Sequence, residues 1–280
     1  MHYDRPEILD ISIEKSKNSE VRKKMSYKNH VWEYIQNKIA TDKALHMSLI
    51  DPDLTFQSLN NIKRLVRYAH DAGTDAFMVG GSTIADQITI DKVVLGIKEA
   101  SDRPVIIFPG NINAFSKNAD ATFFMSLINS DNLYFVIRSH VIGAPTVKLW
   151  NLEPISLAYI IVEPGATAGF IGEAHMIPRN KPKIAAAYAL AAQYIGFKLV
   201  YLEAGSGAAE TVPVEMVKIV TSFVDIPVFV GGGIVNKEQA TEFVKAGAKI
   251  IVQGTYLEKV VPKDKGAGLA EIIQAIKHPK

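Results

Sequence analysis

Eight short apolar runs recur along the chain, and each neighbouring pair is separated by a helical or helix-sized segment. The runs cover residues 44–50, 75–80, 104–110, 133–138, 158–165, 197–203, 226–233 and 248–255. They are continuous rather than strictly alternating, as expected for strands that helices cover. Strands alternating with helices indicate parallel βαβ units. Eight units without a dinucleotide-binding fingerprint favour an α/β fold closed into a (β/α)8 TIM barrel over an open doubly wound sheet.

Helical patterns fill the intervals between these runs. The first helix has apolar residues from Phe56 to Ala69 on one face, with Thr55 as a plausible N-cap and Gly73 at its end. Asn236 and Gln239 resemble a capping box. Further helices are expected at 87–100, 183–195, 214–224, 236–247 and 267–277, with a weaker helical pattern at 111–130 and a short helix at 149–156.

Length and composition fit one barrel domain. The chain has 280 residues, and such barrels typically need about 250. We expect residues 1–30 to be an N-terminal polar extension and residues 31–280 to be the catalytic barrel domain. A net charge of +2 gives no bulk attraction to nucleic acid, and the lack of cysteine excludes disulfides and thiolate chemistry. No signal peptide or membrane-spanning apolar run is evident, so we expect a cytoplasmic protein that is not integral to a membrane.

Glycine-rich turns end the last two predicted strands. Gly231, Gly232 and Gly233 close the seventh run, and Gly254 with Thr255 closes the eighth. In barrels of this kind, phosphate is often held after these two strands by backbone N–H groups, and glycine lets the backbone approach the phosphate closely. The turns therefore predict a phosphate site, although ordinary left-handed turns have the same composition.

The sixth run ends in a second candidate site, Tyr201-Leu202-Glu203-Ala204-Gly205-Ser206-Gly207. Strand parity places Tyr201 and Glu203 on one face, and they point into the barrel if Leu199 does. Glu203 would then stand at the mouth, where barrel enzymes keep catalytic residues, and could accept a hydroxyl proton. The alternative is a solvated glutamate at a strand end.

The first run ends in Asp51-Pro52-Asp53, which is a candidate metal site. A carboxylate there could hold Mg²⁺ together with substrate phosphates, and Ser82 after the second run could add a hydroxyl ligand. The alternative is that an aspartate here only caps the next helix. For Asp53 we favour capping, and for Asp51 both interpretations stay open.

Taken together, these motifs resemble the geranylgeranylglyceryl phosphate synthase family, with its heptaprenylglyceryl phosphate synthase relatives. The motifs are HMSLIDPD at 46–53, FMVGGST at 77–83, MSLINSDNLYFVI at 125–137, YLEAGSG at 201–207, VGGGI at 230–234 and VQGT at 252–255. The resemblance implies a TIM barrel whose third helix is irregular. It also implies a Mg²⁺-dependent prenyltransferase that joins geranylgeranyl diphosphate to sn-glycerol 1-phosphate, forming the first ether bond of archaeal membrane lipids, and a homo-oligomer.

Site residues follow from the same resemblance. Asp51 and Ser82 correspond to magnesium ligands, and Glu203 is the candidate that orients or deprotonates the glycerol hydroxyl. The glycerol phosphate site corresponds to Tyr201, Leu202, Glu203, Ala204, Gly205, Ser206, Gly207, Gly232, Gly233, Gly254 and Thr255. The chain departs from the family at Leu54, where a lysine often follows the DPD motif.

Two other functions stay open on the residues alone. The chain could be another phosphate-binding barrel enzyme, such as a sugar-phosphate isomerase that uses Asp51 as an acid or base. It could also be a non-catalytic barrel that binds phosphate. Strict Mg²⁺ dependence and use of a prenyl diphosphate would separate the synthase from both.

Overall fold

Eight parallel strands close into a barrel in the computed structural model, which describes residues 29–81 and 86–279. The sheet closes because β8 pairs with β1, with Leu45 opposite Ile250. The strands are β1 (Leu45–Ile50), β2 (Ala76–Val79), β3 (Val105–Ile107), β4 (Ala121–Leu127), β5 (Glu153–Ile161), β6 (Leu199–Glu203), β7 (Val228–Gly231) and β8 (Ile250–Gln253). The expected (β/α)8 barrel is therefore confirmed.

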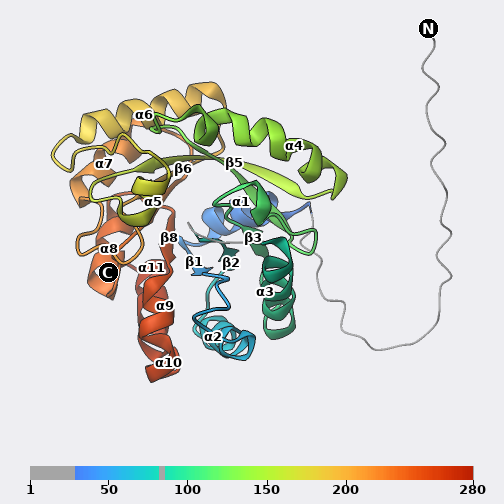
Figure 1. The fold of residues 1–280 in the computed structure, drawn as a ribbon. Coiled ribbons are helices and arrows are strands. Elements are labelled where there is room, and N and C mark those ends of the chain that lie inside the picture. The colour runs from blue at the N-terminus through green and yellow to red at the C-terminus, as the bar shows by residue number, and fades with distance from the viewer. Residues whose placement is uncertain (1–28, 82–85, 280) are drawn as a thin grey trace, which may run out of the picture.

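Helices surround the strands (Figure 1). They are α1 (Val31–Thr41), α2 (Leu59–Asp71), α3 (Gln87–Ala100), α4 (Ser139–Leu149), α5 (Ala166–Ile171), α6 (Pro182–Ile195), α7 (Val214–Phe223), α8 (Lys237–Lys245), α9 (Thr255–Lys259), α10 (Val261–Asp264) and α11 (Ala267–Lys277). Between β3 and β4 the described chain has only a 3-10 turn, η1 (Ile112–Ala114), in place of a full helix. The third helix is thus irregular, as expected.

The region from 111 to 156 was assigned wrongly from the sequence. The fourth strand is β4 at Ala121–Leu127, inside the segment predicted to be helical, and residues 134–138 form a π-helical turn (η2) that leads into α4. The predicted helix at 149–156 instead contains the start of β5. The reason is non-local: β4 pairs with β5 over seven residues, which no local pattern reveals.

Most other elements agree with the sequence. The predicted helices at 183–195, 214–224 and 267–277 differ from α6, α7 and α11 by at most one residue at either end. Asn236 caps α8 by accepting a hydrogen bond from the Gln239 amide at 2.9 Å. The start of α2 was wrong: Ser58, not Thr55, is the N-cap, and Phe56 is 90% exposed rather than buried.

The barrel interior is filled at mid-height by aromatic rings. Phe123 and Phe229 pack edge to face with their centroids 5.6 Å apart, and Tyr201 lies 5.7 Å from Phe229. All three side chains are essentially buried. Because this layer blocks the axis, the barrel is a packed core below it and can be hollow only above it.

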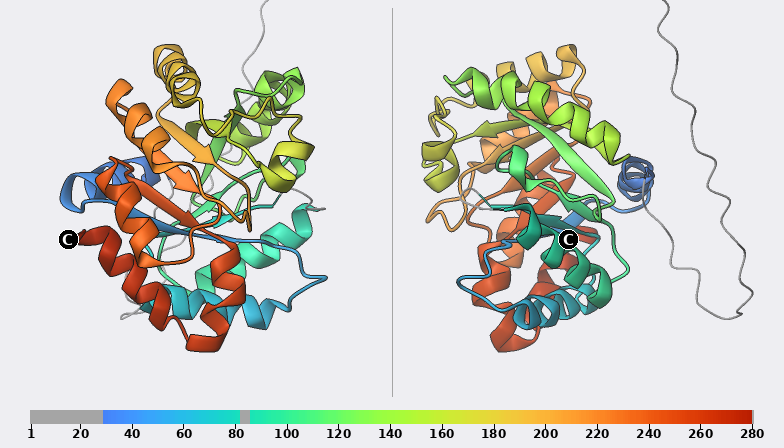
Figure 2. Two further views of the ribbon diagram at one scale, coloured as in Figure 1. Left: turned by 90° about the vertical axis from the view of Figure 1, so that its left-hand side faces the viewer. Right: turned by 45° about the vertical axis from the view of Figure 1, so that its right-hand side comes forward.

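Helix α1 closes the N-terminal end of the barrel. The right-hand view of Figure 2 shows α1 in blue, at the opposite end from α5. Val31 and Ile35 are fully buried, and the Glu153 carboxylate at the start of β5 accepts the amides of Val31 at 2.7 Å and Trp32 at 3.1 Å. A carboxylate at a helix N-terminus satisfies free amides and complements the helix dipole.

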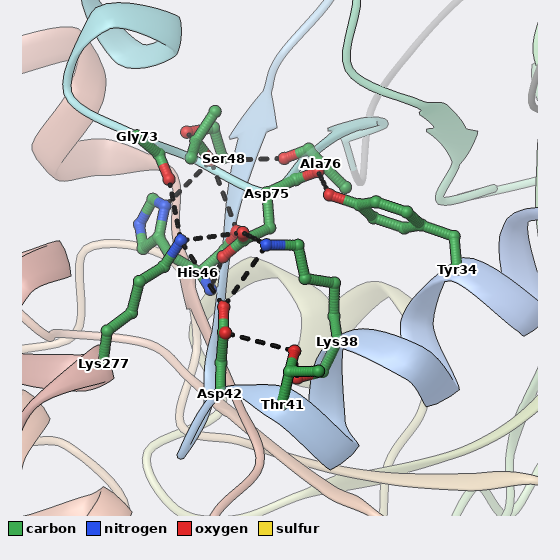
Figure 3. Close-up of polar contacts among 11 residues, drawn as sticks. Tyr34, Lys38, Thr41, Asp42, His46, Ser48, Gly73, Asp75, Ala76 and Lys277 are labelled. Carbon is green, nitrogen blue, oxygen red and sulfur yellow. Dashed lines mark hydrogen bonds and ion pairs between the residues drawn. The ribbon is translucent and has the colours of Figure 1, made fainter. Parts of the chain in front are cut away.

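Asp75 is the centre of a polar network at this closed end (Figure 3). Its side chain is buried, accepts the His46 amide at 3.0 Å, and pairs with Lys277 at 2.9 Å and Lys38 at 3.7 Å. The network joins α1, the strands β1 and β2, and the last helix α11. His46 itself is a buried core residue: its ring contacts Thr74, and burial lowers its pKa to about 4.

The predicted extension at residues 1–30 lies outside the described residues, apart from its last two positions. Within the described residues the first helix is α1, which begins at Val31, and the domain boundary at residues 30–31 stays a prediction. None of the helices in the described ranges is both long and apolar enough to cross a bilayer.

Replacing Asp75 by alanine should destabilise the whole barrel. The change leaves the His46 amide buried without its acceptor and removes the carboxylate that Lys277 and Lys38 share. We expect the free energy of unfolding to fall by about 3 kcal/mol, measured by denaturant titration. The matched control is Glu271→Ala, which breaks an exposed pair with Lys237 at 3.2 Å and should cost less than about 1 kcal/mol. Equal losses in the two variants would contradict a central role for Asp75.

Candidate active site

A cavity of about 560 Å³ opens at the carboxyl ends of the strands, above the aromatic layer. One side is polar, and its lining includes Asp51, Glu203, Ser206, Gly232, Gly233, Gln253, Gly254, Thr255 and Glu258. The other side is apolar, and its lining includes Phe108, Phe115, Phe123, Phe124, Met125, Tyr134 and Phe135. The site can therefore take a ligand with one charged end and one hydrocarbon end.

The predicted phosphate turns meet on the polar side. Gly232 and Gly233 adopt φ values of +87° and +72°, which favour glycine. The hydroxyls of Ser206, after β6, and Thr255, after β8, lie 2.9 Å apart, so the loops of the two strands that flank β7 touch at this point. The turns thus gather exposed backbone and hydroxyl groups in one small region, as an anion site requires.

Glycine is required at Gly231 and Gly232 because the side chains of β6 press against them. A Cβ atom on Gly231 would lie 2.2 Å from the Tyr201 hydroxyl, and one on Gly232 would lie 2.5 Å from Glu203 Oε1. The turn after β7 and the end of β6 are therefore packed tightly against each other.

Glu203 is buried at the cavity wall, only 6% exposed. Its Oε1 accepts the Gly205 amide at 2.6 Å, and the Tyr201 hydroxyl also hydrogen-bonds to the carboxylate. Burial raises the pKa of Glu203, and the hydrogen bonds from Tyr201 and Gly205 oppose part of that rise. A carboxylate with a raised pKa, held in one orientation, is a stronger proton acceptor than an ordinary exposed carboxylate.

The predicted parity of β6 is confirmed. Leu199 and Tyr201 belong to the barrel interior, whereas Leu202 and Ala204 pack between the strands and the outer helices. The side chains of these last two residues therefore do not reach the cavity. Eight of the residues predicted to bind substrate line it directly: Tyr201, Glu203, Ser206, Gly207, Gly232, Gly233, Gly254 and Thr255. Leu202, Ala204 and Gly205 are not among the lining residues.

Asp51 faces the same cavity from the end of β1. Within the described residues, its carboxylate accepts one hydrogen bond, from the Asp53 amide at 3.0 Å, and has no cationic partner. Burial is the main cause that raises the pKa of Asp51. Asp53 instead binds the Thr55 amide and hydroxyl, so it shapes the turn before α2 rather than the cavity. Ser82, the other predicted metal ligand, lies outside the described residues.

Sequence reasoning missed Glu258, which lines the cavity from the short helix α9. Its pKa is raised, mainly by burial and then by the charge of Asp51, so the two carboxylates face a common space. A glutamate on the helix after the last strand has no local signature that separates it from a solvent-facing charge. No group of three or more His, Cys, Asp or Glu residues that could hold a metal occurs within 29–81 and 86–279.

The apolar side of the cavity ends near His140, at the start of α4. Its Nε2 atom is buried without a hydrogen-bond partner in the described part of the chain, and its ring packs on Phe124 with centroids 4.9 Å apart. Burial lowers the pKa of His140, so the ring is neutral at physiological pH. His175 lies elsewhere, exposed and 3.6 Å from Asp131.

Comparison with known proteins gives one consistent result. The PcrB family model matches residues 37–276. Geranylgeranylglyceryl phosphate synthase of Pyrococcus abyssi is 52% identical over 241 residues, which cover 86% of this chain and 95% of that protein. The corresponding synthase of Methanosarcina mazei is 48% identical over 245 residues, covering 87% and 98%.

A solved structure of a similar protein also matches this chain. It is (S)-3-O-geranylgeranylglyceryl phosphate synthase from Thermoplasma acidophilum in complex with its substrate sn-glycerol-1-phosphate. It superposes with a TM-score of 0.84 and 43% identity, over 88% of this chain and 98% of that one. Mycobacterium tuberculosis tryptophan synthase, 14% identical with a TM-score of 0.59, shares the fold alone.

The Glu203→Gln variant should be more stable than the parent at neutral pH. Because burial raises the folded pKa of Glu203 above its usual 4.5, ionisation costs stability as the pH rises from 4.5 through the folded value. Glutamine removes that cost, so we expect a rise in melting temperature of about 2–4 °C at pH 7.5 and little change at pH 4.

The matched control is Glu242→Gln, on the exposed face of α8, which should leave the melting temperature unchanged at both pH values. A Glu203→Gln protein that melts below the parent at pH 7.5 would show that the carboxylate stabilises the fold.

Proposed function

The chain belongs to the PcrB family, and from that premise we propose that it is a prenyltransferase joining geranylgeranyl diphosphate to sn-glycerol 1-phosphate. The products are geranylgeranylglyceryl phosphate and diphosphate. The family expected from the sequence motifs is confirmed. The observation that carries the proposed reaction is the cavity itself, in which glycine turns and a buried glutamate share one space with an apolar wall.

We place sn-glycerol 1-phosphate on the polar side of the cavity. The turns at Gly232-Gly233 and Gly254-Thr255 would receive its phosphate, with the Ser206 hydroxyl and the amides of the YLEAGSG segment beside it. Glu203 would then face a glycerol hydroxyl. The Thermoplasma acidophilum synthase, which is 43% identical, binds sn-glycerol-1-phosphate, and this supports the placement.

The prenyl chain would lie along the apolar side. Five aromatic residues line this side of the cavity: Phe108, Phe115, Phe123, Phe124 and Tyr134. Burying the hydrocarbon there is favourable, at roughly 25 cal/mol per Å² of apolar surface removed from water. The same wall excludes water, which would otherwise compete with the glycerol oxygen for the reactive carbon.

Magnesium dependence fits the residues present. Asp51 and Glu258 are two carboxylates that face one space, and Asp51 forms no salt bridge within the described residues, whereas Lys259 partly offsets the charge of Glu258. Asp51 and the hydroxyl of Ser82 would hold Mg²⁺ together with the diphosphate, since Mg²⁺ commonly uses one or two protein carboxylates plus substrate phosphates. When bound, the ion would neutralise the charge that develops on the diphosphate leaving group.

The reaction forms one carbon–oxygen bond, breaks another and moves one proton. The glycerol hydroxyl oxygen attacks the first carbon of the prenyl chain and forms the ether C–O bond, while the C–O bond to diphosphate breaks and its electron pair leaves with the diphosphate. The hydroxyl proton passes to Glu203 or to the departing diphosphate. The chain's own contribution is to hold both reactants in line, which avoids much of the entropic cost of their meeting.

A sugar-phosphate isomerase is the less favoured function, because such a substrate has no hydrocarbon part and leaves the apolar half of the cavity unused. A non-catalytic phosphate-binding barrel would not need the buried, oriented Glu203. The homo-oligomeric state and the cytoplasmic location expected from the sequence remain predictions.

The direct test is turnover. Purified protein with Mg²⁺, sn-glycerol 1-phosphate and geranylgeranyl diphosphate should yield the ether product by mass spectrometry, and the sn-3 enantiomer should react much more slowly. Glu203→Gln should lower kcat by about 100-fold or more, because the hydroxyl loses its oriented acceptor. Phosphate binding with no ether product from any prenyl donor would contradict the proposed function.

Asp51→Asn should lower kcat/KM by about two orders of magnitude and raise the Mg²⁺ concentration needed for half-maximal rate, because the amide is a poor magnesium ligand. Asp53→Asn is the matched control, since Asp53 lies two residues away, its side chain binds only the following turn, and its backbone amide still donates to Asp51 in the variant. It should stay within about threefold of the parent. An unchanged magnesium requirement in Asp51→Asn would exclude Asp51 as a ligand.

A further inference from the structure

Arg179 connects two loops at the active-site end of the barrel. It lies between β5 and α6, and its Nη1 donates to the backbone carbonyl oxygens of Glu163 at 3.2 Å and Thr211 at 2.7 Å. Its Nε pairs with Glu210 at 3.0 Å, and its own amide contacts the Glu163 carboxylate at 3.3 Å. The guanidinium therefore bridges the loop after β5 and the loop after β6.

The loop after β6 needs such an anchor. Ser206, Gly207, Ala209 and Glu210 are exposed, so packing does little to fix the middle of the loop, whereas Val212 at its end is fully buried. At its start the Glu203 carboxylate holds the Gly205 amide, and at its middle Ser206 meets Thr255. Toward its end, Arg179 holds the Thr211 carbonyl.

Movement of this loop would reach the predicted phosphate turn directly. A Cβ atom on Gly233 would lie 2.7 Å from the Ala208 carbonyl oxygen and 3.5 Å from Thr211 Cγ2. The Gly233 turn is thus packed against residues 208–211. A shift of Thr211 would therefore also shift the Gly233 turn.

We propose that Arg179 is a positioning residue for the glycerol phosphate end of the active site. In the described structure it does not line the cavity, so it acts through Thr211 and the 208–211 segment, which supports the Gly233 turn. The inference rests on the proposed function, because it assigns the phosphate to that turn.

Of the contacts that Arg179 makes, the hydrogen bonds to the carbonyl oxygens of Glu163 and Thr211 are the ones that position the loop. The ion pair with Glu210 is weak because the Glu210 side chain is 67% exposed. A guanidinium can bridge two fixed carbonyl groups with one planar head, whereas a lysine ammonium is a single point on a flexible stem. Lysine at this position would keep the charge and lose the bridge.

The test compares Arg179→Lys with Glu210→Gln, and uses Arg64→Lys on the exposed face of α2 as the control for the substitution itself. The affinity for inorganic phosphate is measured by calorimetry, the KM for each substrate by turnover, and the melting temperature by scanning. Arg179→Lys should weaken phosphate binding and raise the KM for sn-glycerol 1-phosphate at least about fivefold, with the KM for the prenyl diphosphate within about twofold. Glu210→Gln and Arg64→Lys should match the parent.

Other outcomes overturn the inference. Unchanged phosphate affinity in Arg179→Lys would exclude a role for the bridge, and equal rises in both KM values with a lower melting temperature would reduce Arg179 to a stabilising residue. The same loss in Glu210→Gln would assign the effect to the ion pair. If the parent protein makes no ether product, the proposed function fails, but the phosphate affinities still decide the role of Arg179.

Discussion

Closure of the sheet by pairing of β8 with β1 is the constraint on which the site depends. In a closed parallel barrel every strand ends at the same rim, so loops far apart in the chain are neighbours there. Ser206 and Thr255 are separated by 49 positions, yet their hydroxyls lie 2.9 Å apart because β6 and β8 flank β7. The end of the barrel opposite the cavity is covered by helix α1, which is held there by hydrogen bonds to Glu153 and by the Asp75 network. Stability and chemistry are therefore assigned to opposite ends of one barrel.

At the cavity, the same burial that prepares chemistry costs stability. Glu203 is almost fully enclosed, next to Tyr201 and against two glycines that no larger residue could replace without moving the carboxylate. Its ionised form is stabilised by only a few hydrogen bonds, and burial raises its pKa despite them. The pKa of Tyr201 is in turn raised by burial and by the charge of Glu203, so the phenol keeps its proton and serves as a donor. A fold selected for stability alone would place an apolar side chain here.

The sequence was sufficient where local patterns and the barrel geometry agree. The parity of β6 was correctly predicted, and the glycine turns after β7 and β8 lie at the same rim as Glu203, because strand ends in a barrel converge whatever the loops do. It failed where the outcome depends on distant partners. Residues 133–138 are rich in aromatic and β-branched side chains, which favour strands. The strand that pairs with β5 is nevertheless β4, at residues 121–127. Glu258 was missed for a similar reason, since only the three-dimensional structure brings it opposite Asp51.

The two halves of the cavity differ because the units that build them differ. Strands β7 and β8 are followed by short glycine-containing turns, and the loop after β6 is held against them by Glu203 and Ser206, so the polar half is compact. Between β3 and β5, a 3-10 turn replaces the third helix and a π-helical turn begins α4. Irregular helices of this kind leave space that a regular helix would fill, and π-turns recur at functional sites. Aromatic residues that follow β3, lie in β4 or belong to the π-turn line that space. The regular part of the barrel thus supplies the precise phosphate end, and the departures from regularity make room for a long apolar chain.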